Sequence, residues 1–198
     1  MKTFFSTQIY QKKISFDLAD LTTEIQQIQN MDTVGKTWSK LNYKKGYTSY
    51  GSIDHLHQMS STFSDLQKKI DRHVSQYLKD LDYVSTLKNL KMTNCWVNVM
   101  PKGAQHTAHI HPHSVISGTF YVSIPTGASA IKFEDPRLAQ FMNAPLVKEK
   151  AKIFNRRFVT LQPNPGDVIL FESWLKHEVP TNETAQPRIS ISFNYGWA

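Results

Sequence analysis

The chain has 198 residues, of which 40% are hydrophobic and 12% aromatic, and this length suits one domain with a sizeable core better than two. No apolar run approaches the roughly 20 residues that cross a bilayer, and the first residues lack the apolar stretch of a signal peptide, so we expect a cytoplasmic protein without a membrane segment. Cys95 is the only cysteine, which excludes an internal disulfide and a cysteine-rich zinc module and leaves imidazole and carboxylate groups as metal ligands.

Two stretches of the first half have the apolar spacing of amphipathic helices. Residues 17–31 and 62–81 place apolar side chains three or four positions apart, so each helix would bury one stripe against a larger surface. Basic residues gather at 36–45 and at 148–157, and the formal net charge is +7. A positive surface favours anionic partners, among them nucleic acid, although no nucleic-acid-binding motif accompanies these residues.

From residue 94 the apolar period changes to two, which is typical of strands. We expect strands at 95–100, 116–124, 130–133, 158–161, 167–171 and 188–195, separated by turns that contain Pro or Gly. Many short strands of this kind indicate a closed or sandwiched antiparallel sheet such as a jelly roll. The prediction is a mostly β fold with N-terminal helices (α+β) in one domain, 1–198, where residues 1–93 form a helical or mixed support region and residues 94–198 form the β core.

Histidines cluster just before the second predicted strand, at His106, His109, His111 and His113. Alternate residues of an extended strand point to the same side, so His109 and His111 share one face and could bind one metal ion together. The third ligand must then come from elsewhere in the chain. His177 is the best candidate, because it comes shortly after a turn and a hydrophobic strand, where functional sites are often built.

The last predicted strand alternates strictly between polar and apolar residues. Arg188 and Ser190 lie on one side, and Ile189 and Ile191 lie on the other. Arginine binds a carboxylate through two parallel hydrogen bonds, and Ser190 could add its hydroxyl to the same carboxylate. An inward Arg188 would need an anionic partner, because burying it alone would cost several kcal/mol. The alternative is a polar row that faces solvent.

The order of these features resembles that of the 2-oxoglutarate- and iron(II)-dependent oxygenases, most closely a microbial and phage subgroup. The resemblance rests on His109-Ile110-His111, the Gly166-Asp167 turn, the distal His177 and Arg188-Ile189-Ser190. It implies a double-stranded β-helix (a jelly roll) with the catalytic core in its β region, and a dioxygenase that uses Fe(II), 2-oxoglutarate and O2. Such an enzyme would hydroxylate a substrate, which the sequence does not indicate, and release succinate and carbon dioxide.

The resemblance also implies a role for individual residues. The implied metal ligands are His109, His111 and His177, and the implied contacts of 2-oxoglutarate are Arg188, Ser190, Tyr121 and Asn98. Alternatively, Tyr121 and Asn98 have a structural role and do not contact 2-oxoglutarate.

At one position the sequence departs from this superfamily, which usually has His-x-Asp or His-x-Glu and so places two histidines and one carboxylate on the iron. His111 occupies the position of the carboxylate. Either His111 is itself a ligand, which gives a three-histidine site, or a carboxylate such as Glu134 or Asp135 takes its place. We favour the first reading, because the family position maps directly onto His111.

Several other residues receive weaker hypotheses. His106 and His113 are secondary candidates for the metal. The pair in His55-Leu56-His57 lies near a predicted helix, where residues two apart diverge, so surface histidines are the better interpretation. Trp174 and Leu175, just before His177, are candidates for the substrate side or for the core.

Two rival functions remain alongside the oxygenase. The first is a three-histidine, cupin-like metalloenzyme that does not use 2-oxoglutarate, and Arg188-Ile189-Ser190 argues against it. The second is a non-catalytic jelly-roll binding module whose histidines hold a structural zinc or nothing.

Overall fold

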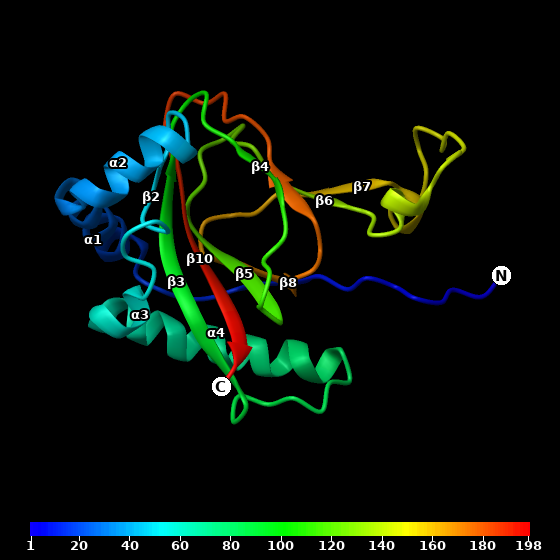
Figure 1. The fold of residues 1–198 in the computed structure, drawn as a ribbon, viewed down its shortest axis with the longest axis horizontal. Coiled ribbons are helices and arrows are strands. Elements are labelled where there is room, and N and C mark those ends of the chain that lie inside the picture. Colours follow the sequence, from blue (N-terminus) through cyan, green and yellow to red (C-terminus); the bar gives the residue numbers. More distant parts are fainter.

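The computed structural model describes the backbone of residues 1–198 and every side chain except that of Ala139. Two antiparallel sheets form the body of the molecule, and helices cover the outer face of the larger sheet (Figure 1). In spatial order, the larger sheet consists of β1 (Tyr10–Lys13), β8 (Asp167–Glu172), β5 (Ile116–Ser123), β10 (Arg188–Trp197), β3 (Leu90–Met100) and β2 (Tyr47–Thr48). The smaller sheet consists of β4 (His106–His109), β9 (His177–Val179), β6 (Ile131–Glu134) and β7 (Phe158–Leu161).

Four α-helices precede β3 in the chain. They are α1 (Leu18–Met31), α2 (Thr33–Asn42), α3 (Leu56–Met59) and α4 (Ser61–Asp80). Two short 3₁₀ turns, η1 (Leu138–Gln140) and η2 (Ile153–Asn155), lie in the long connection between β6 and β7, which extends away from the body (Figure 1). No helix of the described chain is long and apolar enough to span a membrane.

The prediction of a mostly β jelly roll with N-terminal helices is confirmed. The two amphipathic patterns of the first half correspond to α1 and α4, and all six predicted strands are present within a few residues of their expected ends. The short strands β1, β2, β4 and β9 were not predicted from the sequence. Because these strands have only two to four residues each, they are too short to show a period of two.

The helix α2 was also missed, and its buried face gives the reason. Only Gly35 and Ser39 of this helix are buried, whereas Val34 and Leu41 are exposed. A helix that packs through small residues lacks the apolar stripe on which the prediction of amphipathic helices depends. The Asp32 carboxylate caps its first turn by accepting a hydrogen bond from the Gly35 backbone N–H at 2.7 Å.

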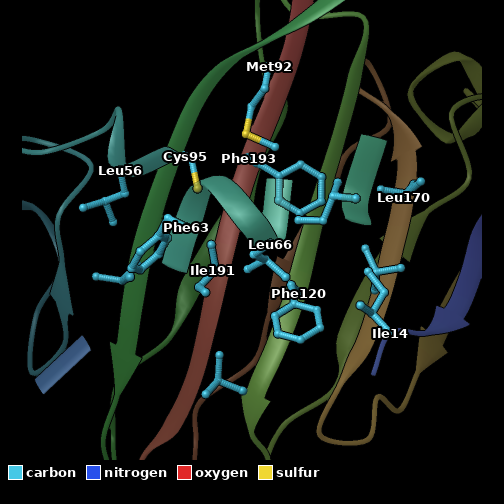
Figure 2. Packing of buried hydrophobic residues seen from close by; sticks show 14 of the residues in the cluster. Ile14, Leu56, Phe63, Leu66, Met92, Cys95, Phe120, Leu170, Ile191 and Phe193 are labelled. Carbon is cyan, nitrogen blue, oxygen red and sulfur yellow. The ribbon is translucent and has the colours of Figure 1, made fainter. Parts of the chain in front are cut away.

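The main core lies between α4 and the outer face of the larger sheet. One stripe of α4 is fully buried: Phe63, Leu66, Ile70, Val74 and Tyr77. It belongs to the same apolar cluster as the strand residues that face it, among them Phe120, Ile191 and Phe193. Figure 2 shows Phe63 and Leu66 of the helix packed with these strand residues. Burial of such side chains contributes about 1.5–3 kcal/mol each, so the helix and the sheet stabilise each other.

The first half of the chain also supplies both edges of the larger sheet. β1 pairs with β8, and β2 pairs with β3. We propose that residues 1–198 form one domain in which residues 1–93 support the β core at residues 94–198, because strands from the first region complete the sheet of the second.

Truncation in this core tests the packing between α4 and the sheet. Ile70 is 1% exposed, so Ile70→Ala is expected to lower the free energy of unfolding by about 2–5 kcal/mol. Val84 is 98% exposed, and Val84→Ala is expected to change it by less than about 0.5 kcal/mol. Denaturant unfolding followed by circular dichroism measures both, and similar losses in the two variants would contradict this account.

Candidate metal centre and the adjoining cavity

Three histidines from two distant parts of the sequence meet at the end of the smaller sheet. His109 is the last residue of β4 and His177 is the first residue of β9, and the two are register partners in the antiparallel ladder. His111 lies two residues beyond β4, where its backbone N–H donates to the Ser173 carbonyl at 3.0 Å. The pairing of β4 with β9 therefore brings together His109 and His177, which are 68 positions apart in the chain.

The three imidazoles converge on one point. One ring nitrogen from each lies within 4.8 Å of the others, and the Nε2 atoms of His111 and His177 are 3.4 Å apart. The Nδ1 atoms of His109 and His177 lie 2.7 Å and 2.9 Å from the backbone carbonyls of Thr107 and Leu175. A hydrogen bond of this kind keeps the proton on Nδ1 and leaves the Nε2 lone pair free for a metal ion.

The surroundings keep the rings of His111 and His177 neutral. Burial, together with the neighbouring His177 and His109, lowers the pKa of His111 to about 3. Burial also lowers the pKa of His177 to about 4, with His109 as the second cause. Because only the neutral imidazole can ligate a metal, the site is prepared to bind a cation.

The other two histidines of the cluster lie apart from this group. His106 stacks on the Tyr43 ring with 4.4 Å between ring centroids, and burial lowers its pKa to about 3. His113 is exposed and has a positive φ of 66°. Neither belongs to the three residues whose ligand atoms lie within 4.8 Å of one another.

The carboxylates considered in place of His111 are held elsewhere. Asp135 forms a two-point contact with Arg137, whose Nε and Nη2 atoms lie 3.0 Å and 2.7 Å from its oxygens. Glu134 lies 2.9 Å from Lys176 Nζ. Among the described residues, the group of potential metal ligands at this site consists of histidines alone.

The expectation of surface histidines at 55–57 was wrong for one of them. His55 is exposed, but His57 is buried, and burial lowers the pKa of His57. An isolated β-bridge between His55 and Cys95 holds this segment against β3. The short helix α3 then turns His57 inward.

A cavity of about 660 Å³ opens beside the three imidazoles. Its floor is the inner face of the larger sheet, where β10 contributes Arg188, Ser190, Ser192 and Asn194. The alternate residues Ile189, Ile191 and Phe193 belong to the core on the helical side. The strict alternation expected for this strand is confirmed, and its polar row faces the cavity instead of solvent.

Arg188 lies at the floor of this cavity and is 1% exposed. Its Nη1 donates to Ser190 Oγ at 3.2 Å, its Nε has no hydrogen-bond partner, and its Cζ lies 5.0 Å from the centroid of the Tyr121 ring. No described carboxylate forms an ion pair with it. A buried guanidinium without an anion is strongly unfavourable, so this position is suited to an anionic ligand.

Further polar atoms without partners surround Arg188. The buried hydroxyls of Tyr121 and Tyr43 have no hydrogen-bond partner, and neither does Asn98 Oδ1, although Asn98 Nδ2 donates to Ser192 Oγ at 3.0 Å. Burial raises the pKa of Tyr121 to about 12 against the opposing effect of the Arg188 charge, so its hydroxyl remains a hydrogen-bond donor. The two tyrosine hydroxyls can each donate a hydrogen bond to an oxygen atom of a ligand.

Tyr43 was missed by the sequence analysis. It ends α2 as the C-cap residue, lines the cavity, and lies close enough to Arg188 that the Arg188 charge opposes the burial-induced rise of its pKa. Its only sequence signal is one aromatic residue in a basic stretch. The two residues proposed for the substrate side lie outside the cavity, since Trp174 is half exposed and Leu175 is buried in the smaller apolar cluster.

The fold defines the chain as a double-stranded β-helix protein. A prolyl-4-hydroxylase from Pseudomonas putida has a similar structure, with a TM-score of 0.63, 12% identity, and coverage of 96% of this chain and 93% of that chain. HygX from Streptomyces hygroscopicus, with nickel and 2-oxoglutarate bound, has a TM-score of 0.63 and 15% identity, with coverage of 96% of this chain and 83% of that chain. The alpha ketoglutarate dependent epimerase SnoN from nogalamycin biosynthesis has a TM-score of 0.67 and 15% identity, with coverage of 96% of this chain and 76% of that chain. At these identities the likeness shows a shared fold.

The sequence itself shows the family. Residues 94–194, about half of the chain, match the family described as "Putative 2OG-Fe(II) oxygenase", and the chain belongs to this family. It is an oxidoreductase that depends on iron(II), 2-oxoglutarate and O2. A comparison with curated protein sequences finds no match.

Proposed function

We propose that His109, His111 and His177 hold the iron(II) and that Arg188 and Ser190 bind the far carboxylate of 2-oxoglutarate. One observation carries this proposal: a buried guanidinium without an acidic partner lies on the floor of the same cavity that the three imidazoles line. A cation site and a carboxylate site at one cavity suit a molecule that chelates a metal at one end and carries a second carboxylate at the other.

Tyr121, Asn98 and Tyr43 complete the cosubstrate site in this proposal. The hydroxyl of Tyr121 would donate to the carboxylate that Arg188 binds, and the hydroxyl of Tyr43, which also lies near Arg188, would donate as well. Asn98 pairs in register with Ser190, and its Nδ2 would donate to the end of 2-oxoglutarate nearer the metal. The two tyrosine contacts would each satisfy a buried hydroxyl that otherwise lacks a partner.

When bound, iron(II) and 2-oxoglutarate supply the oxidative chemistry, in which O2 is consumed and succinate and carbon dioxide are released. The protein contributes position and shielding from water. We propose that the substrate is hydroxylated. The crystal structures of HygX with nickel and 2-oxoglutarate and of SnoN with Fe3+ and alpha ketoglutarate support this choice of ligands for the fold.

We further propose that the protein acts in the cytoplasm. Cys95, the single cysteine, is a buried free thiol, which suits a reducing compartment.

Replacement of His111 tests the three-histidine site. His111→Ala is expected to weaken iron(II) binding by more than roughly 100-fold, since loss of a direct ligand should exceed the 10–100-fold effect of outer contacts. His111→Asp would restore the two-histidine, one-carboxylate ligand set and should retain binding. Anaerobic titration with iron(II), followed by the absorbance change on addition of 2-oxoglutarate, measures both.

His113→Ala is the matched control, because His113 is exposed in the same loop, and it should bind iron as the unmodified protein does. Equal losses from His111→Ala and His113→Ala would show that the loop matters only for folding. Unchanged iron affinity in His111→Ala would exclude His111 as a ligand.

Replacement of Arg188 tests the carboxylate site by two measurements. Arg188→Met is expected to raise the Kd of 2-oxoglutarate by roughly 10- to 150-fold, because a charge-assisted hydrogen bond contributes about 1.5–3 kcal/mol. The same variant should unfold at an equal or higher denaturant concentration without ligand, because an apolar side chain replaces an unpaired buried charge. Calorimetric titration and chemical unfolding provide the two values.

Arg156→Met serves as the control, since the Arg156 side chain is exposed and its Nε donates to the Ala151 carbonyl at 2.9 Å. It should leave the affinity for 2-oxoglutarate unchanged. A marked loss of stability in ligand-free Arg188→Met would indicate that Arg188 has a structural role, and the carboxylate assignment would then fail.

A further inference from the structure

One continuous segment of the first half forms a wall of the cavity. The lining includes Trp38, Leu41 and Asn42 of α2, the loop at 43–45, Thr48 of β2, and Tyr50. In Figure 1 this segment, α2 and β2, lies beside β3 on the side of the larger sheet opposite β8. Neither the metal nor the cosubstrate proposal uses Trp38 or Tyr50, although both are large aromatic residues at the cavity.

Aromatic rings from this wall and from β3 form a row that begins next to the metal centre. The ring centroids of Trp96 and His111 are 6.1 Å apart, those of Tyr50 and Trp96 are 5.0 Å apart, and those of Trp38 and Tyr50 are 6.1 Å apart. We call Trp96, Tyr50 and Trp38 the aromatic row. Tyr50 is 50% exposed while Trp96 is buried, so the row leads from the protein interior to solvent.

The Trp38 ring of the row is fixed by close backbone packing. Trp38 lies against Gly51, where an added Cβ would come within 2.4 Å of the indole ring. The buried Asp32 carboxylate connects the segment by accepting hydrogen bonds from Tyr47 Oη at 2.8 Å and from Ser52 Oγ at 2.5 Å. Preorganised rings bind a ligand with little loss of conformational entropy, so the row is suited to stacking.

The charges along the same wall have one sign. Lys44 and Lys45 line the cavity and are exposed, and the described part of the chain gives neither of them an ion pair. Lys45 extends over the cavity residue Gly103, where an added Cβ would lie 2.8 Å from Nζ. The described lining contains no aspartate or glutamate, so the mouth attracts anions.

We propose that the substrate oxidised by this enzyme is an anion that carries a planar ring, which stacks on the aromatic row while its acidic group pairs with Lys44 and Lys45. This inference rests on the proposed function, because it takes the three imidazoles as the metal centre toward which the row leads. The acidic group is a phosphate or a carboxylate, because either anion can pair with the ammonium groups of Lys44 and Lys45.

Binding of defined probes to the anaerobic holoenzyme, saturated with 2-oxoglutarate, tests the proposal. The probes are thymidine 5′-monophosphate and indole-3-acetate, each compared with its uncharged partner, thymidine or indole-3-acetamide, by calorimetric titration. We expect one charged probe to bind roughly tenfold more tightly than its partner and to weaken as salt is added. A preference for the nucleotide would assign the phosphate, and a preference for indole-3-acetate would assign the carboxylate.

Variants then locate the bound probe. Trp38→Ala should weaken the charged probe roughly tenfold, as loss of one stacking ring predicts, and the double variant Lys44→Gln with Lys45→Gln should remove the advantage over the uncharged partner. The matched controls are Trp197→Ala, an exposed indole outside the cavity, and Lys148→Gln with Lys150→Gln, exposed lysines of the β6–β7 connection. Both controls should leave binding unchanged.

Three results would overturn the proposal: no probe binds, charged and uncharged partners bind equally, or the control variants weaken binding as much as the test variants. Binding of 2-oxoglutarate in the same titrations separates this failure from failure of the proposed function. If 2-oxoglutarate binds and no probe does, the substrate class is wrong and the cosubstrate site stands. If 2-oxoglutarate does not bind, the proposed function fails independently of the probes.

Discussion

A guanidinium group shielded from water, with no carboxylate beside it, is the constraint from which the function of this fold follows. The fold keeps Arg188 at the cavity floor because β10 is paired on both edges, with β3 and β5, and its apolar face packs in the core on the helical side. Such a buried charge is tolerated where an anionic ligand neutralises it. The protein therefore gives up stability in its ligand-free state, and binding of a dianion recovers it.

The strand β10 could be predicted from the sequence, whereas several shorter strands could not, and the difference has physical reasons. A strict period of two over eight residues, together with an apolar face that must meet α4, determines which side of β10 is polar. The sequence could not show whether that polar side meets water or a cavity, because the answer depends on the smaller sheet. His57 and Tyr43 were misjudged or missed because a β-bridge and a helix end turn them inward, and neither leaves a periodic pattern.

The residues of the candidate metal site could be proposed from the sequence, but their arrangement in space could not. The spacing of His109 and His111 indicates a shared face, but only the β4–β9 ladder brings His177 to them. With three residues in β9 and four in β4, local propensity cannot specify that pairing, and tertiary packing decides it. Short strands at a functional site thus escape prediction even where their chemical groups are recognised.

The ligand set and the substrate wall fit together electrostatically. A carboxylate at position 111 would cancel the positive charge left when a dianionic cosubstrate meets a divalent metal and Arg188, whereas neutral imidazole leaves that charge in place. Lys44 and Lys45 add to it at the mouth. Every residue proposed for the metal and the cosubstrate lies within 94–194 except Tyr43, while Trp38, Tyr50 and both lysines come from the first half. The β core therefore supplies the reaction, and the segment at 38–50 selects what enters it, with the β2–β3 ladder holding one against the other.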